Sequence, residues 1–244
     1  MTPKLLRAPG FLRRAAARIV QPKLHLLVAA LASTAAIPAA HSQQLLFDYV
    51  GFDYEYPKVD TTFGGIGNGY VTLGEVPVVA APLVSDQTND QYTYVLTGLT
   101  ATSRFVSGSF VVVDYSGPGT LTLYEDSRST GTPFDYGVNP PNGTAPPSFT
   151  DGTAILVGAI TNFRYVLNTA TGSGSFDANF AAAGGTQLGN IPPGQRNGWT
   201  FAGTTTNTIT IPLGYAHQVD GQTMIPEPTA GRPVSWGQIK RKYR

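Results

Sequence analysis

Short stretches in which apolar and polar residues alternate recur throughout the middle of the chain. In each of them every second residue is apolar, as in a strand with one buried and one exposed face. The apolar positions of four such stretches are Tyr92, Tyr94 and Leu96; Leu121 and Leu123; Phe163, Tyr165 and Leu167; and Phe176, Ala178 and Phe180. The chain also has 28 glycines and 19 prolines, which favour turns over helices. The middle of the chain is therefore predicted to consist of strands and turns.

Turn-forming segments separate these stretches. Ser116–Gly119 (SGPG) is expected to fold the strand that ends at Tyr115 back onto the strand that begins at Thr120. A second turn is predicted at 168–174 (NTATGSG). The segment 128–148 contains too many prolines for a central strand, so we expect a long surface loop there.

The number and spacing of the strands define the expected fold. About nine or ten strands, spaced by about 10–15 residues, favour an all-β fold, namely an antiparallel β-sandwich or jelly-roll-like single domain with disordered termini. We expect a signal peptide at 1–42, the β-sandwich domain at 43–224, and a proline-containing linker with a basic tail at 225–244.

Charged residues are segregated along the chain. All 15 acidic residues lie between residues 43 and 228, with only five basic residues among them. This part of the chain would be repelled by a phosphate backbone, which argues against a nucleic-acid partner. The chain has no cysteine, which excludes disulfides, thiol chemistry and cysteine-ligated metals.

The first 42 residues have the order of a secretory signal peptide. A basic segment is followed by the apolar stretch 26–37 and then by small residues. Ala40 and Ser42 at the −3 and −1 positions predict cleavage before Gln43. The alternatives are an uncleaved anchor and an arginine-rich transit peptide. Export without cysteine favours a bacterial protein. We expect it to be secreted or held at the cell surface, with no transmembrane segment in the mature chain.

Residues for catalysis are scarce, so the chain is not expected to be an enzyme. His217 is the one histidine after residue 42, and no G-x-S-x-G motif is present. His217 is interpreted as a surface or sheet-edge residue. Glu55, Glu75 and Glu125 are the candidate carboxylates of a glycosidase, which needs two of them across a cleft. No alternating pattern of acids brings them to one face.

Among metal sites, the sequence favours one for calcium. Asp86, Asn89 and Asp90 offer oxygen ligands within six residues between two expected strands. Further acids crowd the start of the domain, at Asp48, Asp53, Glu55 and Asp60. The alternative is a polar turn in which Asp and Asn only supply the turn geometry. No other cofactor is expected.

Aromatic residues offer a second kind of binding surface. Tyr54, Tyr56 and Trp199 are candidates for stacking against sugars. Most tyrosines and phenylalanines, however, occupy alternating strand positions, where packing into the core is the commoner outcome.

Several glycine- and aromatic-rich stretches resemble exported bacterial β-sandwich surface proteins of the PEP-CTERM kind. They are 150–158 (TDGTAILVG), 172–177 (GSGSFD), 184–185 (GG) and 198–201 (GWTF). Ile225–Pro228 (IPEP) resembles the sorting dipeptide of these proteins, and a basic end follows it without the apolar sorting helix. The resemblance implies a surface or matrix component and carries no catalytic residues with it.

The basic tail resembles a C-terminal Ser-Trp-Gly-x-Ile-Lys signature of exported bacterial proteins. Its residues are Trp236, Gly237, Ile239 and Lys240. A secretion or sorting machine would read such a signature. The alternatives are a basic end that contacts anionic lipid or polymer, and a frayed terminus.

Together these features predict a secreted or cell-surface, non-catalytic structural or adhesive protein. Its expected partners are a cell-envelope polymer or the sorting machinery. The alternative is a carbohydrate- or calcium-binding β-sandwich module.

Overall fold

The computed structural model describes residues 43–137 and 147–226. The predicted signal peptide, the basic tail and its four signature residues lie outside the described residues. The last strand includes Ile225 and Pro226, which the sequence had assigned to the linker.

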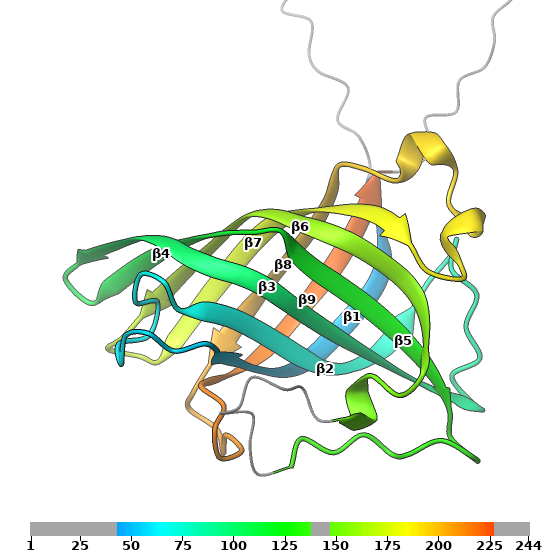
Figure 1. Ribbon diagram of the computed structural model, residues 1–244, viewed down its shortest axis with the longest axis horizontal. Coiled ribbons are helices and arrows are strands. Elements are labelled where there is room, and N and C mark those ends of the chain that lie inside the picture. Colours follow the sequence, from blue (N-terminus) through cyan, green and yellow to red (C-terminus); the bar gives the residue numbers. More distant parts are fainter. Residues whose placement is uncertain (1–42, 138–146, 227–244) are drawn as a thin grey trace, which may run out of the picture. The chain divides into compact units, whose positions relative to one another are not determined.

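The described chain folds into nine strands and three short 3-10 helices (Figure 1). The strands are β1 (Gln43–Glu55), β2 (Gly69–Val79), β3 (Asp90–Ser107), β4 (Phe110–Ser116), β5 (Gly119–Ser127), β6 (Thr153–Asn168), β7 (Ser173–Gly184), β8 (Trp199–Thr206) and β9 (His217–Pro226). The helices are η1 (Pro147–Phe149), η2 (Leu188–Asn190) and η3 (Pro193–Gln195).

The strands form one closed antiparallel barrel, so the predicted sandwich is wrong. The sheet order β2-β1-β9-β8-β7-β6-β4-β3-β5 is completed by additional pairings of β2 with β3 and of β6 with β5. The first strand pairs with the last, from Gln43 opposite Pro226 to Asp53 opposite His217. A sandwich and a barrel share the same alternation along each strand. Only this pairing of distant strands distinguishes them.

Two of the nine strands occupy one position in the wall, which gives the barrel eight positions. Both β4 and β5 pair with β3 on one side and with β6 on the other. The turn residues of Ser116–Gly119 predicted a hairpin, and this prediction is wrong. The segment interrupts one long strand, because Pro118 has no N–H for a ladder hydrogen bond.

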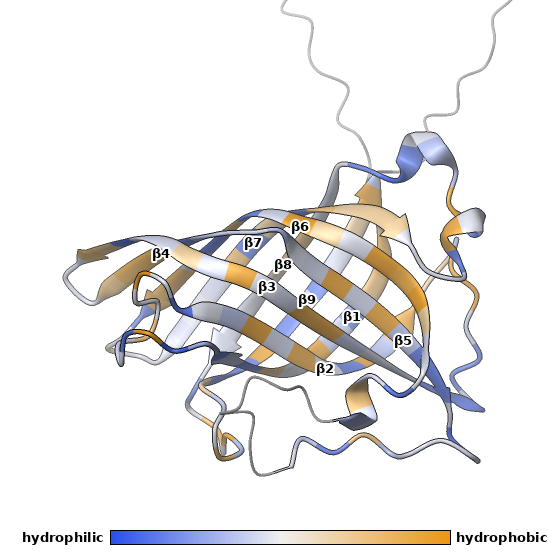
Figure 2. Ribbon diagram, viewed as in Figure 1, coloured by the Kyte–Doolittle hydropathy of each residue, from blue (hydrophilic) through white to orange (hydrophobic). Residues whose placement is uncertain are grey.

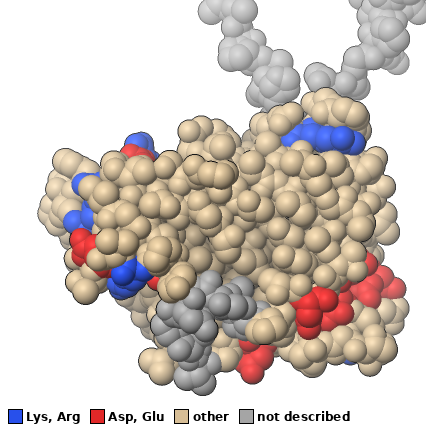
Figure 3. Space-filling view, in the orientation of Figure 1, with Lys and Arg blue, Asp and Glu red and all other residues tan. Residues whose placement is uncertain are grey.

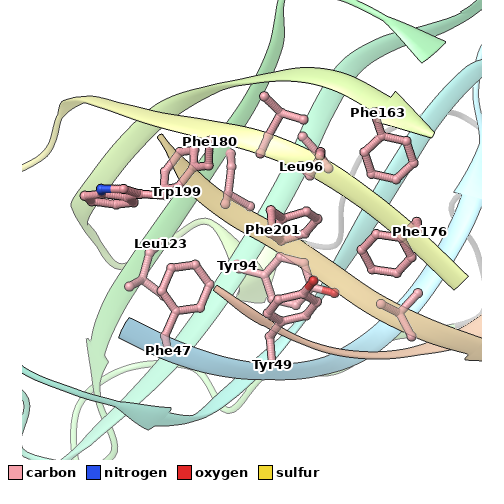
Figure 4. Packing of buried hydrophobic residues seen from close by; sticks show 14 of the residues in the cluster. Phe47, Tyr49, Tyr94, Leu96, Leu123, Phe163, Phe176, Phe180, Trp199 and Phe201 are labelled. Carbon is pink, nitrogen blue, oxygen red and sulfur yellow. The ribbon is translucent and has the colours of Figure 1, made fainter. Parts of the chain in front are cut away.

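Aromatic side chains fill the barrel interior (Figure 4). The rings of Tyr49 and Phe201 are stacked with their centroids 4.7 Å apart, and Phe163 and Phe176 are stacked at 5.4 Å. The rings of Trp199 and Phe180 meet edge to face, with their centroids 5.1 Å apart. The four alternating stretches predicted from the sequence all place their apolar residues in this core, which confirms their assignment as strands.

The outward positions of β6 to β9 are mainly small and polar, so the wall appears blue and pale between orange bands in Figure 2. On the opposite side a second apolar cluster lies outside the barrel, around Tyr54, Leu73 and Phe149, and is covered by Phe134 and Tyr136. The described part of the predicted long loop thus folds against the wall.

Within the described ranges, no helix is long and apolar enough to cross a membrane.

The two ends of the barrel differ. At one end, here called the terminal end, β1 begins and β9 finishes (Figure 1). At the other, the loop end, the chain passes between strands through 56–68, the tight turn at 108–109, the turn at 169–172 and the loop 207–216. The second of the turns predicted from the sequence, between β6 and β7, is confirmed there.

Candidate functional site

A cluster of buried polar side chains closes the loop end from inside. Asp53 on β1 lies opposite His217 on β9, and both face the interior. Asp53 Oδ1 is 2.9 Å from the backbone nitrogen of His217 and 3.1 Å from its Nδ1. Asp53 Oδ2 lies 3.3 Å from the hydroxyl of Tyr70 and 3.4 Å from that of Tyr165. Both oxygens of this fully buried carboxylate are therefore engaged.

The second inward carboxylate, Glu55, fastens the loop 56–68. Its Oε1 accepts a hydrogen bond of 2.6 Å from the backbone N–H of Gly64, and Tyr115 donates to the same oxygen at 3.4 Å. Its Oε2 accepts from Asn68 Nδ2 at 2.9 Å. Because Asn68 Oδ1 accepts the backbone N–H groups of Val59 and Asp60, both at 2.7 Å, the carboxylate and the amide together set the path of the loop.

Phe63 covers this cluster from the loop side. Its ring lies edge-on to His217 at 4.7 Å between centroids and packs against Tyr165 at 5.2 Å. The cluster of Asp53, Glu55, Asn68, Tyr70, Tyr115, Tyr165 and His217 is called the buried polar cluster below.

Burial and charge shift the pKa values of Glu55 and His217 in this cluster. Burial raises the pKa of Glu55 above its usual range, although hydrogen bonds from Gly64 and Asn68 oppose the rise. Burial acts to lower the pKa of His217, but the carboxylate of Asp53 outweighs it, and the pKa of His217 is raised. The carboxylate of Asp53 thus stabilises the imidazolium form of His217 relative to a histidine in water, and in that form Nδ1–H is donated to Asp53.

The buried polar cluster corrects the interpretation of His217 as a surface or sheet-edge residue. The sequence signal that was missed is Asp53-Tyr54-Glu55, in which period two puts both acids on one face of a strand. With its acceptors occupied by the protein itself and Phe63 above it, the cluster fixes a loop and plugs one end of the barrel.

A groove on the outside of the barrel offers accessible polar groups. It has a volume of about 760 Å³ and is called the wall groove. Its lining residues come from β4, the β4–β5 interruption, β6 and β7, and are Asp114, Tyr115, Ser116, Gly117, Pro118, Thr161, Asn162, Phe163, Arg164 and Asp177.

The wall groove lies where the ladder of β6 is interrupted. The β4–β6 ladder begins at Tyr115 opposite Phe163, and the β5–β6 ladder resumes only at Gly119 opposite Ile160. Between these pairs, Asn162 has a φ of 55°, the only positive value among the described residues that are not glycine. Strained backbone of this kind is concentrated at functional sites.

Charged side chains border the wall groove. Arg164 binds Asp114 through two contacts, Nε to Oδ1 at 2.7 Å and Nη2 to Oδ2 at 3.3 Å. The Arg164 hydrogen bond is the main reason why the pKa of Asp114 is lowered. The two side chains are 57% and 41% exposed, and Asp177 lies opposite Arg164 on β7. Hydrogen-bond donors on Arg164 and acceptors on the two aspartates are thus held side by side and remain open to solvent.

The residues of the predicted calcium site form a turn at the terminal end. Asp86 accepts hydrogen bonds from the backbone N–H groups of Thr88 and Asn89, both at 3.2 Å, and from Asn89 Nδ2 at 2.7 Å. These bonds, chiefly that of the Asn89 side chain, lower the pKa of Asp86. Nowhere in 43–137 or 147–226 do three or more His, Cys, Asp or Glu residues gather as metal ligands would.

The other candidate residues are dispersed. Trp199 and Tyr54 are buried, and Tyr56 alone of the three aromatic candidates is exposed. Glu75 lies on β2, and Glu125 near the end of β5 accepts a hydrogen bond from Tyr92 at 3.0 Å. The acids near the start of the domain also separate: Asp48 occupies an outward position on β1, and Asp60 lies in the loop 56–68.

Comparison with protein-family models found no match, and neither the curated proteins nor the solved structures include a match to this chain. The resemblance noted in the sequence stays a prediction.

Proposed function

We propose that this chain is an exported, non-catalytic adhesive protein that binds a polyhydroxylated polymer, such as a cell-envelope polysaccharide, through the wall groove. The observation that carries the proposal is the interruption of the barrel wall between β4 and β5, opposite Asn162. It leaves a groove lined by fixed polar groups on the outside of the barrel.

The chemistry of the wall groove suits sugar hydroxyls. A hydroxyl both donates and accepts, so it is recognised by paired donors and acceptors held side by side. The Arg164–Asp114 pair supplies such an arrangement, and Asp177 adds a further acceptor. A volume of about 760 Å³ falls in the range of ligand sites, and a groove open to solvent can hold part of a long chain.

Two features support a non-catalytic role. The barrel interior is filled with aromatic rings. His217 and the inward carboxylate of Asp53 bind each other. The second inward carboxylate, Glu55, binds donors of the loop above it. These buried groups hold the fold rigid, and binding takes place on the outside of the barrel.

The start of the first strand agrees with export. Strand β1 begins at Gln43, the residue expected to follow signal-peptide cleavage. The outward residues of β7, including Ser175, Asp177 and Asn179, are those of a wall that stands in water, as an adhesive protein on the cell surface or in the medium would.

Affinity electrophoresis in gels that contain individual soluble polysaccharides tests the proposal. We expect at least one polysaccharide to retard the protein, and we expect Asp177→Asn and Arg164→Gln to reduce the retardation. Asp151→Asn is the matched control, because Asp151 is exposed at the terminal end. If no polysaccharide retards the protein, or if the groove variants behave like the control, the proposal is wrong.

A further inference from the structure

Exposed apolar side chains gather at the loop end. Of the ten large apolar residues that are exposed in the described chain, eight lie there, on the loop 56–68, the β3–β4 hairpin and the loop 207–216. They are Tyr56, Val59, Ile66, Phe105, Val106, Phe110, Ile209 and Leu213. The other two, Val78 and Val84, lie toward the terminal end.

The β3–β4 hairpin carries the two phenylalanines on its outer face. Phe105 pairs with Val112, and Ser107 pairs with Phe110, so the two rings are diagonal neighbours on the same side of the hairpin. Phe105 is 66% and Phe110 is 50% exposed. The hairpin tip reaches beyond the other strands, at the far left of Figure 1.

The loop 56–68 holds its apolar side chains outward because the buried polar cluster fixes its backbone. Asn68 accepts the backbone N–H of Val59, and Glu55 accepts that of Gly64. Val59 and Ile66 are exposed on this loop, while Phe63 points into the barrel. The exposed positions are therefore part of a rigid arrangement.

Charge is also distributed unequally between the ends (Figure 3). Lys58 and Arg104 belong to the loop end, and the exposed Asp60 lies near them. Arg164 lies on β6 in the wall groove, where it binds Asp114 and has Asp177 opposite it on β7. Acids gather at the terminal end, at Asp86, Asp90, Glu125, Asp126 and Asp151.

We propose that the loop end docks on an anionic lipid surface. Phe105, Phe110 and the apolar residues of the two loops enter the interface between headgroups and acyl chains, and Lys58 and Arg104 face the lipid phosphates. Apolar side chains at an interface and basic residues near it both contribute to binding anionic membranes. The barrel then stands with its terminal end, and its acids, away from the lipid.

The arrangement of the apolar residues favours lipid over a protein partner. They stand on three separate segments around the rim. A protein partner would need one continuous and complementary apolar core, whereas fluid lipid fills the space around separate side chains. The wall groove lies on the side of the barrel, so lipid docking is independent of polymer binding and one can fail without the other.

Vesicle flotation tests lipid docking with the full chain. We expect the wild type to float with vesicles of phosphatidylcholine and phosphatidylglycerol, and Phe105→Ser/Phe110→Ser to bind at least tenfold more weakly. Val78→Ser/Val84→Ser is the matched control and should bind like the wild type. All three proteins keep the same two chain ends, so any binding by those ends is equal among them.

The proposal is overturned if the wild type does not float with the vesicles, or if the hairpin variant binds as tightly as the control. The alternative is that the loop end binds a second copy of the chain. Light scattering on the same proteins would detect such a dimer. A dimer that is lost in the hairpin variant, without vesicle binding by the wild type, would assign the loop end to self-association and refute lipid docking.

Discussion

Asp53 and His217, separated by 164 residues in sequence, face each other across the β1–β9 pair, with Asp53 Oδ1 in reach of both the backbone nitrogen and the ring of His217. This contact lies where the first strand meets the last. The closure of the barrel and the protonation of one histidine are thereby linked.

Stability should decline as the pH rises above 6.5 because of His217. Its pKa is raised in the fold, so above the usual value of about 6.5 the folded chain binds more protons than the unfolded one. The contribution is present below pH 6.5 and is lost as the pH passes the folded pKa, with a slope of at most about 1.4 kcal/mol per pH unit. Urea unfolding from pH 6 to 9 measures the slope.

The matched variant is His217→Gln, which removes the titrating ring. It should be less stable than the wild type at pH 6 and should show a flatter pH dependence above 6.5. An equal slope in both proteins would assign the effect to another group.

The stacked rings of the interior should dominate the stability. Phe201 is buried between Tyr49 and Phe176, with centroids at 4.7 and 5.5 Å. Phe201→Ala should lower the free energy of unfolding by about 3–5 kcal/mol. The exposed Phe110 is the control, because Phe110→Ala should change it by no more than about 0.5 kcal/mol. Similar losses in both variants would contradict the packing described for the core.

Asn162 should reveal the strain at the wall groove. A residue with a side chain at a φ of 55° is in the left-handed region, which asparagine and glycine tolerate best. Asn162→Ala should therefore cost about 1 kcal/mol, while Asn162→Gly should be close to neutral. Thermal unfolding of the two variants gives the comparison, and an alanine variant as stable as the glycine variant would speak against the backbone geometry.

Calcium should not stabilise the protein more than magnesium. Asp86 already uses its carboxylate to hold its own turn, so both ions should act only by screening the negative charge of the domain. Melting temperatures at equal ionic strength test this. A larger shift with calcium, abolished in Asp86→Asn/Asp90→Asn, would instead establish the metal site.

The local strand pattern was predictable, and the closure was not. Phe176, Ala178 and Phe180 alternate with polar residues, and they line the core as expected. The same alternation serves a sandwich or a barrel, and the choice depends on pairing between Gln43 and Pro226, far apart in the chain. The turn propensity of Gly117-Pro118 was correctly recognised, but turn residues also interrupt a strand that continues in the same direction.

The buried polar cluster was missed for a related reason. Charged residues are rarely buried without partners, so the sequence offered Asp53 and Glu55 only as candidate ligands or catalytic carboxylates and placed the lone histidine at the surface or a sheet edge. Asp53 and His217 become partners only once the barrel closes. The strain at Asn162 likewise has no local signal, because it follows from the shift in register between β6 and β7.

The pairing of the first strand with the last also decides which part of the wall guards the protein against aggregation. An antiparallel wall without β9 would leave the edges of β1 and β8 unpaired, and such edges join other chains. The residues that cover both edges are 217–226, so a single strand keeps the barrel from pairing with its neighbours.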